Sequence, residues 1–170
     1  LNEYLTKFEY PLMLLQTIDS IEYAVYSLMK RQSEQNLLYS EIRFAPQLHT
    51  KKGLSQEEVV TASLKGRQKY FDELRQKENI KEGDIPSFYS NIILCCMRGN
   101  GNEMENEETI RIAAEFLSDS DGVVAVDLAG AEALFPTSDY EKLFAHARAE
   151  GIPFTIHAGE AAGPESIRQA

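Results

Sequence analysis

GVVAVDL, residues 122–128, is apolar along its length until it reaches Asp127. A continuous apolar run, rather than one that alternates with polar residues, is typical of a strand buried on both faces of a parallel sheet. Further stretches are also rich in apolar residues, and each has a polar residue near or directly after its carboxyl end: residues 36–45, 87–97 (followed by Arg98) and 152–157. The chain is therefore expected to contain a series of buried parallel strands.

Helical patterns separate these strands. Residues 55–77 have apolar side chains at helical spacing, and Ser55 and Glu58 match the capping box that begins a helix. Further helices are expected at 103–117, at 138–150 and from Pro164 onward, and residues 1–8 and 20–35 look helical with Tyr10-Pro11 as an interruption. The alternation predicts an α/β fold whose chemistry gathers at the carboxyl ends of the strands. A doubly wound sheet and a (β/α)8 barrel both fit this pattern.

Composition narrows the classes of partner. The chain has 17 basic and 27 acidic residues, a formal charge of −10, which argues against nucleic acid or an anionic membrane surface as the main partner. No apolar run reaches the roughly 18 residues that a membrane span needs, and no signal peptide is expected. The adjacent Cys95 and Cys96 lie in an apolar strand and point to opposite faces, so we expect reduced core thiols in a cytoplasmic protein.

His157 and Glu160 follow the last expected strand, in the sequence HAGE. A histidine at the end of a rigid strand can ligate zinc through its neutral imidazole, and Gly159 allows a tight turn before Glu160. A carboxyl group beside a metal or a substrate can donate a proton if burial raises its pKa. The spacing alone leaves a second interpretation open, in which His157 is a hydrogen-bonded core residue and Glu160 caps the next helix.

Asp127 ends an apolar strand, where a carboxylate needs a partner. Two interpretations stay open: Asp127 belongs to a functional site, or it forms a structural pair with Arg43 or Arg98. Gly130 can bring its backbone N–H close to a ligand because it has no side chain. The other polar candidates are interpreted as structural or surface residues: Glu41, Arg43, His49 and His146.

Three motifs occur in a recognisable order: YSEIRFAP at 39–46, VVAVDLAGAE at 123–132, and TIHAGE at 155–160 followed by Gly163-Pro164-Glu165. Together they resemble successive strand motifs of the adenosine deaminase family. Residues 91–98 resemble the intervening strand, and residues 1–8 resemble the family's apolar lid helix. The resemblance covers essentially the whole chain.

This resemblance implies a zinc-bearing (β/α)8 TIM barrel that hydrolyses the 6-amino group of adenosine, giving inosine and ammonia. His157 matches a zinc ligand, Glu160 matches the acid that protonates purine N1, and Gly130 matches a backbone donor to purine N3. Ala131 stands where the family has an aspartate. The implied cofactor is Zn²⁺, and the implied partner is a small purine nucleoside in cytoplasmic purine metabolism. The lid positions are Leu1, Tyr4, Leu5 and Phe8.

The resemblance also implies that the chain is a central part of one barrel domain, with a lid and helical segment at 1–35 and successive βα units at 36–170. It would supply about strands two to five, because a full barrel takes about 250 residues. The other metal ligands would lie before Leu1 and after Ala170, so these residues alone are expected to be inactive. Open sheet edges at 37–44 and 153–157 are expected to make the isolated piece self-associate. A deaminase of adenine or another purine, and a non-catalytic barrel binding module, remain alternatives.

Overall fold

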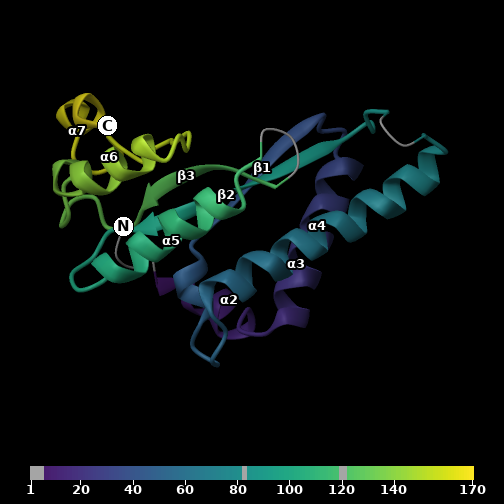
Figure 1. Ribbon diagram of the computed structural model, residues 1–170, viewed down its shortest axis with the longest axis horizontal. Coiled ribbons are helices and arrows are strands. Elements are labelled where there is room, and N and C mark those ends of the chain that lie inside the picture. The colour runs from purple at the N-terminus through teal and green to yellow at the C-terminus, as the bar shows by residue number, and fades with distance from the viewer. Residues whose placement is uncertain (1–5, 82–83, 119–121) are drawn as a thin grey trace. The chain divides into compact units, whose positions relative to one another are not determined.

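The computed structural model describes residues 6–81, 84–118 and 122–170 (Figure 1). Strands β1, β2 and β3 form a parallel sheet in that order, which confirms the α/β class and part of the expected sheet. The elements follow one another as α2 (Glu9–Leu14), α3 (Ile18–Glu34), β1 (Tyr39–Phe44), the 3-10 helix η1 (Pro46–His49), α4 (Gln56–Glu78), β2 (Tyr89–Met97), α5 (Glu103–Glu115), β3 (Val123–Ala129), the 3-10 helix η2 (Thr137–Tyr140), α6 (Glu141–Ala149) and α7 (Pro164–Gln169).

The described residues form two compact units. One comprises residues up to 42 together with 48–92, and the other comprises residues 43–47 together with 93–170. Among the residues that the structure describes, none of the helices combines the length and the apolar composition that spanning a bilayer requires.

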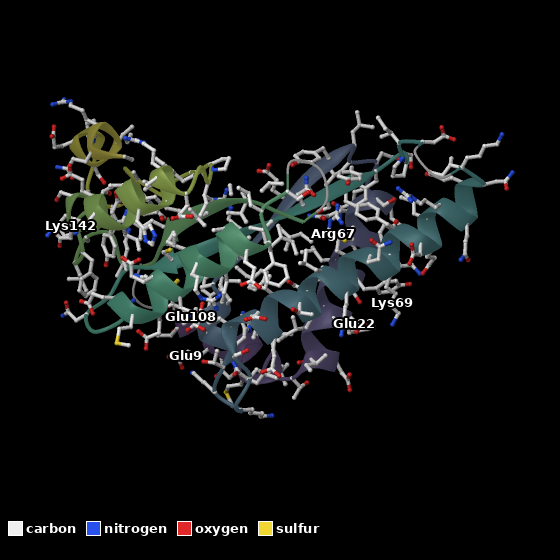
Figure 2. All side chains as sticks on the ribbon, viewed as in Figure 1. Glu9, Glu22, Arg67, Lys69, Glu108 and Lys142 are labelled. Atoms are coloured by element: carbon white, nitrogen blue, oxygen red, sulfur yellow. The ribbon has the colours of Figure 1, made fainter. Side chains whose placement is uncertain are left out.

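The first unit is built on the packing of α3 against α4. Its core holds the apolar residues Val25, Met29, Ile42, Tyr70, Phe71, Leu74 and Phe88. The two helices approach closely at Gly66, where a Cβ atom would lie 2.3 Å from the backbone oxygen of Glu22. An ion pair between Lys69 and Glu22 lies beside this approach, with Nζ 3.2 Å from Oε1 (Figure 2).

The capping box expected at the start of α4 is confirmed. The side chain of Ser55 accepts a hydrogen bond from the backbone of Glu58, and Glu58 accepts one from the backbone of Ser55. These two bonds satisfy donors that the first turn of a helix leaves without an intrahelical partner.

The second unit has an apolar core of its own. Its core joins β2, α5, β3 and α6 through fully or nearly fully buried side chains: Ile93, Leu94, Cys96, Ile110, Ile112, Val126, Leu128 and Phe144. Cys95 and Cys96 are both buried and free, which confirms the expectation of reduced core thiols. Burial raises the pKa of both thiols, so both are protonated at neutral pH.

The last expected strand, 152–157, is shorter than predicted. The segment runs parallel to β3, with Thr155 N donating to Val126 O at 2.9 Å and His157 N donating to Leu128 O at 3.2 Å. Outside the named strands, however, its pairing amounts to an isolated parallel bridge between Val126 and Phe154. Pro153 lacks the N–H that a regular ladder needs, which explains why the pairing starts late.

One local prediction near the first helices is wrong. Tyr10-Pro11 does not interrupt a helix, because α2 runs from Glu9 to Leu14 across it. Pro11 lies in the first turn, where the missing N–H would have had no intrahelical partner.

His49 is not a surface residue. It is buried, and its Nδ1 lies 2.6 Å from the backbone oxygen of Leu15. Burial lowers the pKa of His49, and the hydrogen bond to Leu15 only partly opposes that shift. Gln16 joins the same two segments, because its Nε2 donates to Leu48 O at 2.8 Å and its Oε1 accepts from Lys51 N at 2.8 Å.

Candidate active site

Asp127 and His157 meet at the carboxyl end of β3. Asp127 has no exposed surface, and its Oδ2 lies 2.7 Å from Nδ1 of His157, whose side chain is 43% exposed. Asp127 Oδ1 also accepts a hydrogen bond of 3.2 Å from the backbone N–H of His157. The apolar strand thus ends in a carboxylate that orients the following segment through both its backbone and its ring.

Arg43 from the end of β1 is the second partner of Asp127. Its guanidinium donates to Oδ2 at 3.3 Å, while the guanidinium of Arg98 donates to the backbone oxygens of Phe135 and His157. The structural pair with Arg43 that the sequence left open is therefore present, and it coexists with the contact to His157. A buried carboxylate is tolerated here because a cation and an N–H donor both face it.

The contact with Asp127 determines which nitrogen of His157 is available. An ionised carboxylate only accepts hydrogen bonds, so Nδ1 carries the proton in this contact, and the tautomer of a neutral ring is the one with its lone pair on Nε2. Metal-ligating histidines commonly donate their other ring N–H to a carboxylate in this way. The arrangement fits His157 as one zinc ligand. Within residues 6–81, 84–118 and 122–170, however, no three His, Cys, Asp or Glu side chains are grouped so that they could hold a metal ion.

Glu160 lies in the turn after His157, and its side chain is exposed. The turn depends on Gly159, whose φ of +84° is rarely adopted by residues with a side chain. A Cβ at this position would also lie 2.5 Å from Cγ1 of Ile167 in α7. The structure therefore places Glu160 on a sharply bent loop that α7 supports.

Gly130 follows β3 with a φ of +116°. A Cβ there would approach the backbone oxygen and the Cβ of Arg98 at 3.3 Å, which is tighter than ordinary packing. Arg98 N donates to Ala129 O at 2.7 Å and thereby holds the end of β2 against this turn. The turn at Gly130 is thus available only to glycine without strain.

Two buried charged residues lie beside this site: Glu132, to which the sequence assigned no role, and Arg98, which the sequence offered only as a possible partner of Asp127. Glu132 is 4% exposed and accepts hydrogen bonds from the backbone N–H groups of Gly159 at 2.6 Å and Ala161 at 2.7 Å, and from Ala162 at 3.3 Å. Burial alone would raise the pKa of this carboxyl, but these bonds and the hydroxyl of Ser166 favour the charged form and lower the pKa to about 2.

Arg98 is also buried, and its guanidinium donates to Phe135 O and to His157 O, both at 2.7 Å. The only feature of the sequence that marks Glu132 and Arg98 as candidates is that each follows an apolar strand. Nothing in the local sequence indicates that their partners lie up to about sixty residues away along the chain.

The expected lid residues are mostly outside the described part of the chain. Leu1, Tyr4 and Leu5 lie outside the described residues. Phe8 is described, directly precedes α2 and is 50% exposed.

Comparison with known proteins agrees with the family resemblance of the sequence motifs. The family model described as adenosine deaminase matches residues 1–170. The chain is similar to proteins named adenosine deaminase from Haemophilus ducreyi, at 48% identity over 171 residues, and from Enterococcus faecalis, at 36% identity over 171 residues. Each alignment covers 100% of this chain and 46% of the relative, so the chain spans about half the length of the curated relatives it matches.

Solved structures agree on the fold. An adenine deaminase from Arthrobacter aurescens aligns with a TM-score of 0.79 and 21% identity, covering 100% of this chain and 47% of that one. The arabidopsis protein ADAL, in complex with IMP, aligns with a TM-score of 0.76 and 21% identity, covering 98% and 46%. These relatives have the TIM-barrel fold, of which the chain carries part. Motifs, fold and relatives all lead to one assignment, and the chain belongs to the adenosine deaminase family.

Proposed function

We propose that the full-length protein containing this chain is a zinc-dependent enzyme that hydrolyses adenosine to inosine and ammonia. The observation that carries the proposal is the pair of Asp127 and His157. This pair leaves Nε2 of His157 available to a metal directly before the HAGE turn. Family membership and the names of the curated relatives support the same reaction.

In this proposal His157 binds zinc through Nε2, and Asp127 holds the ring in the required orientation. Zinc bound there would supply an activated water near neutral pH. Glu160 donates a proton to purine N1, which makes C6 more electrophilic as negative charge develops on the ring. The backbone N–H of Gly130 donates to purine N3, and the side chains of the lid exclude water: Leu1, Tyr4, Leu5 and Phe8.

The choice of adenosine over another purine rests on the closer relatives. Proteins of 48% and 36% identity are named adenosine deaminase, whereas the adenine deaminase and ADAL share only 21% identity and support the fold alone. Deamination of adenine or of another purine is the second candidate. A barrel that binds a ligand without catalysis is the third, and it differs in lacking a complete metal site.

The test is a zinc-loaded preparation of the full-length protein, assayed by the fall in adenosine absorbance, with adenine and AMP as parallel substrates. Turnover of adenosine well above that of the other two is expected. Preferred turnover of adenine or AMP would replace adenosine by that substrate, and tight ligand binding without turnover of any of the three would identify a binding module.

Two finer proposals concern the setting of the protein. We propose a cytoplasmic location, which is consistent with two free, buried cysteines. We also propose that the 170-residue piece on its own self-associates through sheet edges at 37–44 and 153–157. Light scattering should then show oligomers or aggregates, and a stable monomer would contradict this proposal.

A further inference from the structure

A buried polar network lies behind the HAGE turn. It consists of Arg98, Thr137, Ser166 and Glu132, each at most 5% exposed. Arg98 Nη2 lies 2.9 Å from Thr137 Oγ1, and Thr137 Oγ1 lies 2.9 Å from Ser166 Oγ. Ser166 Oγ donates to Glu132 Oε1, which completes the chain of contacts.

The direction of every hydrogen bond in this network follows from its two ends. A guanidinium can only donate, and an ionised carboxylate can only accept. Ser166 gives its single proton to Glu132, so Thr137 must donate to Ser166 and accept from Arg98. Each hydroxyl therefore donates once and accepts once, and such chains strengthen one another in a buried setting.

The same two charged residues hold the backbone on both sides of Glu160. Arg98 binds the carbonyl of His157, while Glu132 binds the N–H groups of Gly159 and Ala161. The peptide groups that flank Glu160 are thus attached to one buried carboxylate. Among residues 6–81, 84–118 and 122–170, no hydrogen bond or ion pair holds the exposed side chain of Glu160, so its direction depends on these backbone bonds.

We propose that Glu132 is a positioning residue, anchored by Arg98, Thr137 and Ser166, which aims the carboxyl of Glu160 at the purine ring. The inference rests on the proposed function, because it assigns a consequence to the placement of Glu160. A catalytic group that is displaced by about 1 Å can lose roughly 100-fold in rate, which makes the anchor a determinant of turnover.

The test is a double-mutant cycle in the zinc-loaded full-length enzyme, combining Glu132→Gln with Glu160→Gln. We expect Glu132→Gln to lower kcat at least about tenfold in the wild-type background, with KM changing less than about threefold. In the Glu160→Gln background it should lower the residual kcat less than about twofold, since the two residues act as one unit. Equal losses in both backgrounds, or no loss in either, would overturn the proposal.

A second readout needs no activity. The amide hydrogens of Gly159, Ala161 and Ala162 should exchange faster with solvent in Glu132→Gln, because their acceptor is weakened. Unchanged exchange would overturn the anchoring. The matched control is Glu115→Gln, which removes an exposed carboxylate of α5 that pairs with Arg111, and it should alter neither rate nor exchange.

If Glu132→Gln does not fold, Ser166→Ala takes its place in the same cycle. Ser166→Ala removes one donor to Glu132. We expect it to lower kcat about threefold in the wild-type background and to have no effect in the Glu160→Gln background. No loss would overturn the proposal. A wild-type enzyme that fails to deaminate adenosine would overturn the proposed function instead, and the exchange measurement would then decide on the anchor alone.

Discussion

Nδ1 of His157 lies 2.7 Å from Oδ2 of Asp127, at the end of a strand whose other side chains are apolar. The contact joins residues thirty positions apart and fixes both the tautomer and the direction of the imidazole. Its strength comes from burial, because the carboxylate has no exposed surface from which water could compete.

Asp127→Asn in the full-length enzyme should weaken zinc binding by about 10- to 100-fold. The amide can still accept from His157, but it no longer supplies the negative charge that favours metal binding by the ring. Competition with a chelator of known affinity measures the change. Asp139→Asn, at an exposed position of η2, is the control and should leave the affinity unchanged. Equal zinc affinity in Asp127→Asn and wild type would contradict the role of the pair.

Glu160→Gln should lower kcat by roughly 10²- to 10⁴-fold, because general acid catalysis contributes about that much. The effect on KM should be small, since glutamine keeps the size and polarity of the side chain. Steady-state kinetics with adenosine measure both constants, with Glu141→Gln on α6 as an exposed control. A kcat within about threefold of wild type would remove Glu160 from the mechanism.

Acid should destabilise the protein through Glu132. The pKa of this carboxyl is about 2 in the folded chain and about 4.3 in an unfolded one, so its contribution is complete above the unfolded value. As the pH falls from about 4.5 to about 2, we expect a loss on the order of 3 kcal/mol in the free energy of unfolding. Denaturant titrations at successive pH values measure it. The loss should be absent from the Glu132→Gln variant, and an identical pH dependence in both proteins would contradict the assignment.

His49 should make stability depend on pH in a different range. Burial lowers the pKa of His49, so the folded chain favours the neutral ring and its contribution is complete above the unfolded pKa of about 6.5. Below that value the free energy of unfolding should decline as the unfolded chain takes up a proton first. His49→Gln should lack this decline, while His146→Gln, on a half-exposed side chain, should retain it. A decline of the same size in His49→Gln would contradict the prediction.

Gly66→Ala should destabilise the packing of α3 against α4. The added Cβ would lie 2.3 Å from the backbone oxygen of Glu22, and two helix backbones must separate to admit it. We expect a loss of about 1–3 kcal/mol in the free energy of unfolding. Lys65→Ala, at the exposed neighbouring position, is the control. Thermal or chemical denaturation compares the two, and a Gly66→Ala variant as stable as wild type would contradict the close approach.

The sequence predicted those features of the fold that depend on local patterns. Continuous apolar runs marked β2 and β3, and Ser55 with Glu58 marked the start of α4. Such signals are readable because strand burial and helix capping involve residues a few positions apart. Pro11 shows the limit of the approach, since the same residue ends a helix in its interior and suits a helix in its first turn.

Predictions that depend on distant partners were less successful. His49 looked like a loop residue beside two lysines, yet it is buried against Leu15. Glu132 looked like part of a motif without a role of its own, and its partners lie 27 to 34 positions further along the chain. Periodicity carries no information about such contacts, because they are created when separate βα units pack together.

The hydrogen bonds from Arg98 through Thr137 and Ser166 to Glu132 all run in one direction. This order restricts how the loop at 158–163 can be redesigned. Any redesign of residues 158–163 must therefore keep the residues at positions 98, 132, 137 and 166 together as one set. If one of these residues is replaced by one that cannot both donate and accept as required, its contact with the next residue holds either two donors or no donor. Grafting the HAGE sequence into another barrel without these four residues would transfer the sequence but not the backbone conformation of the turn.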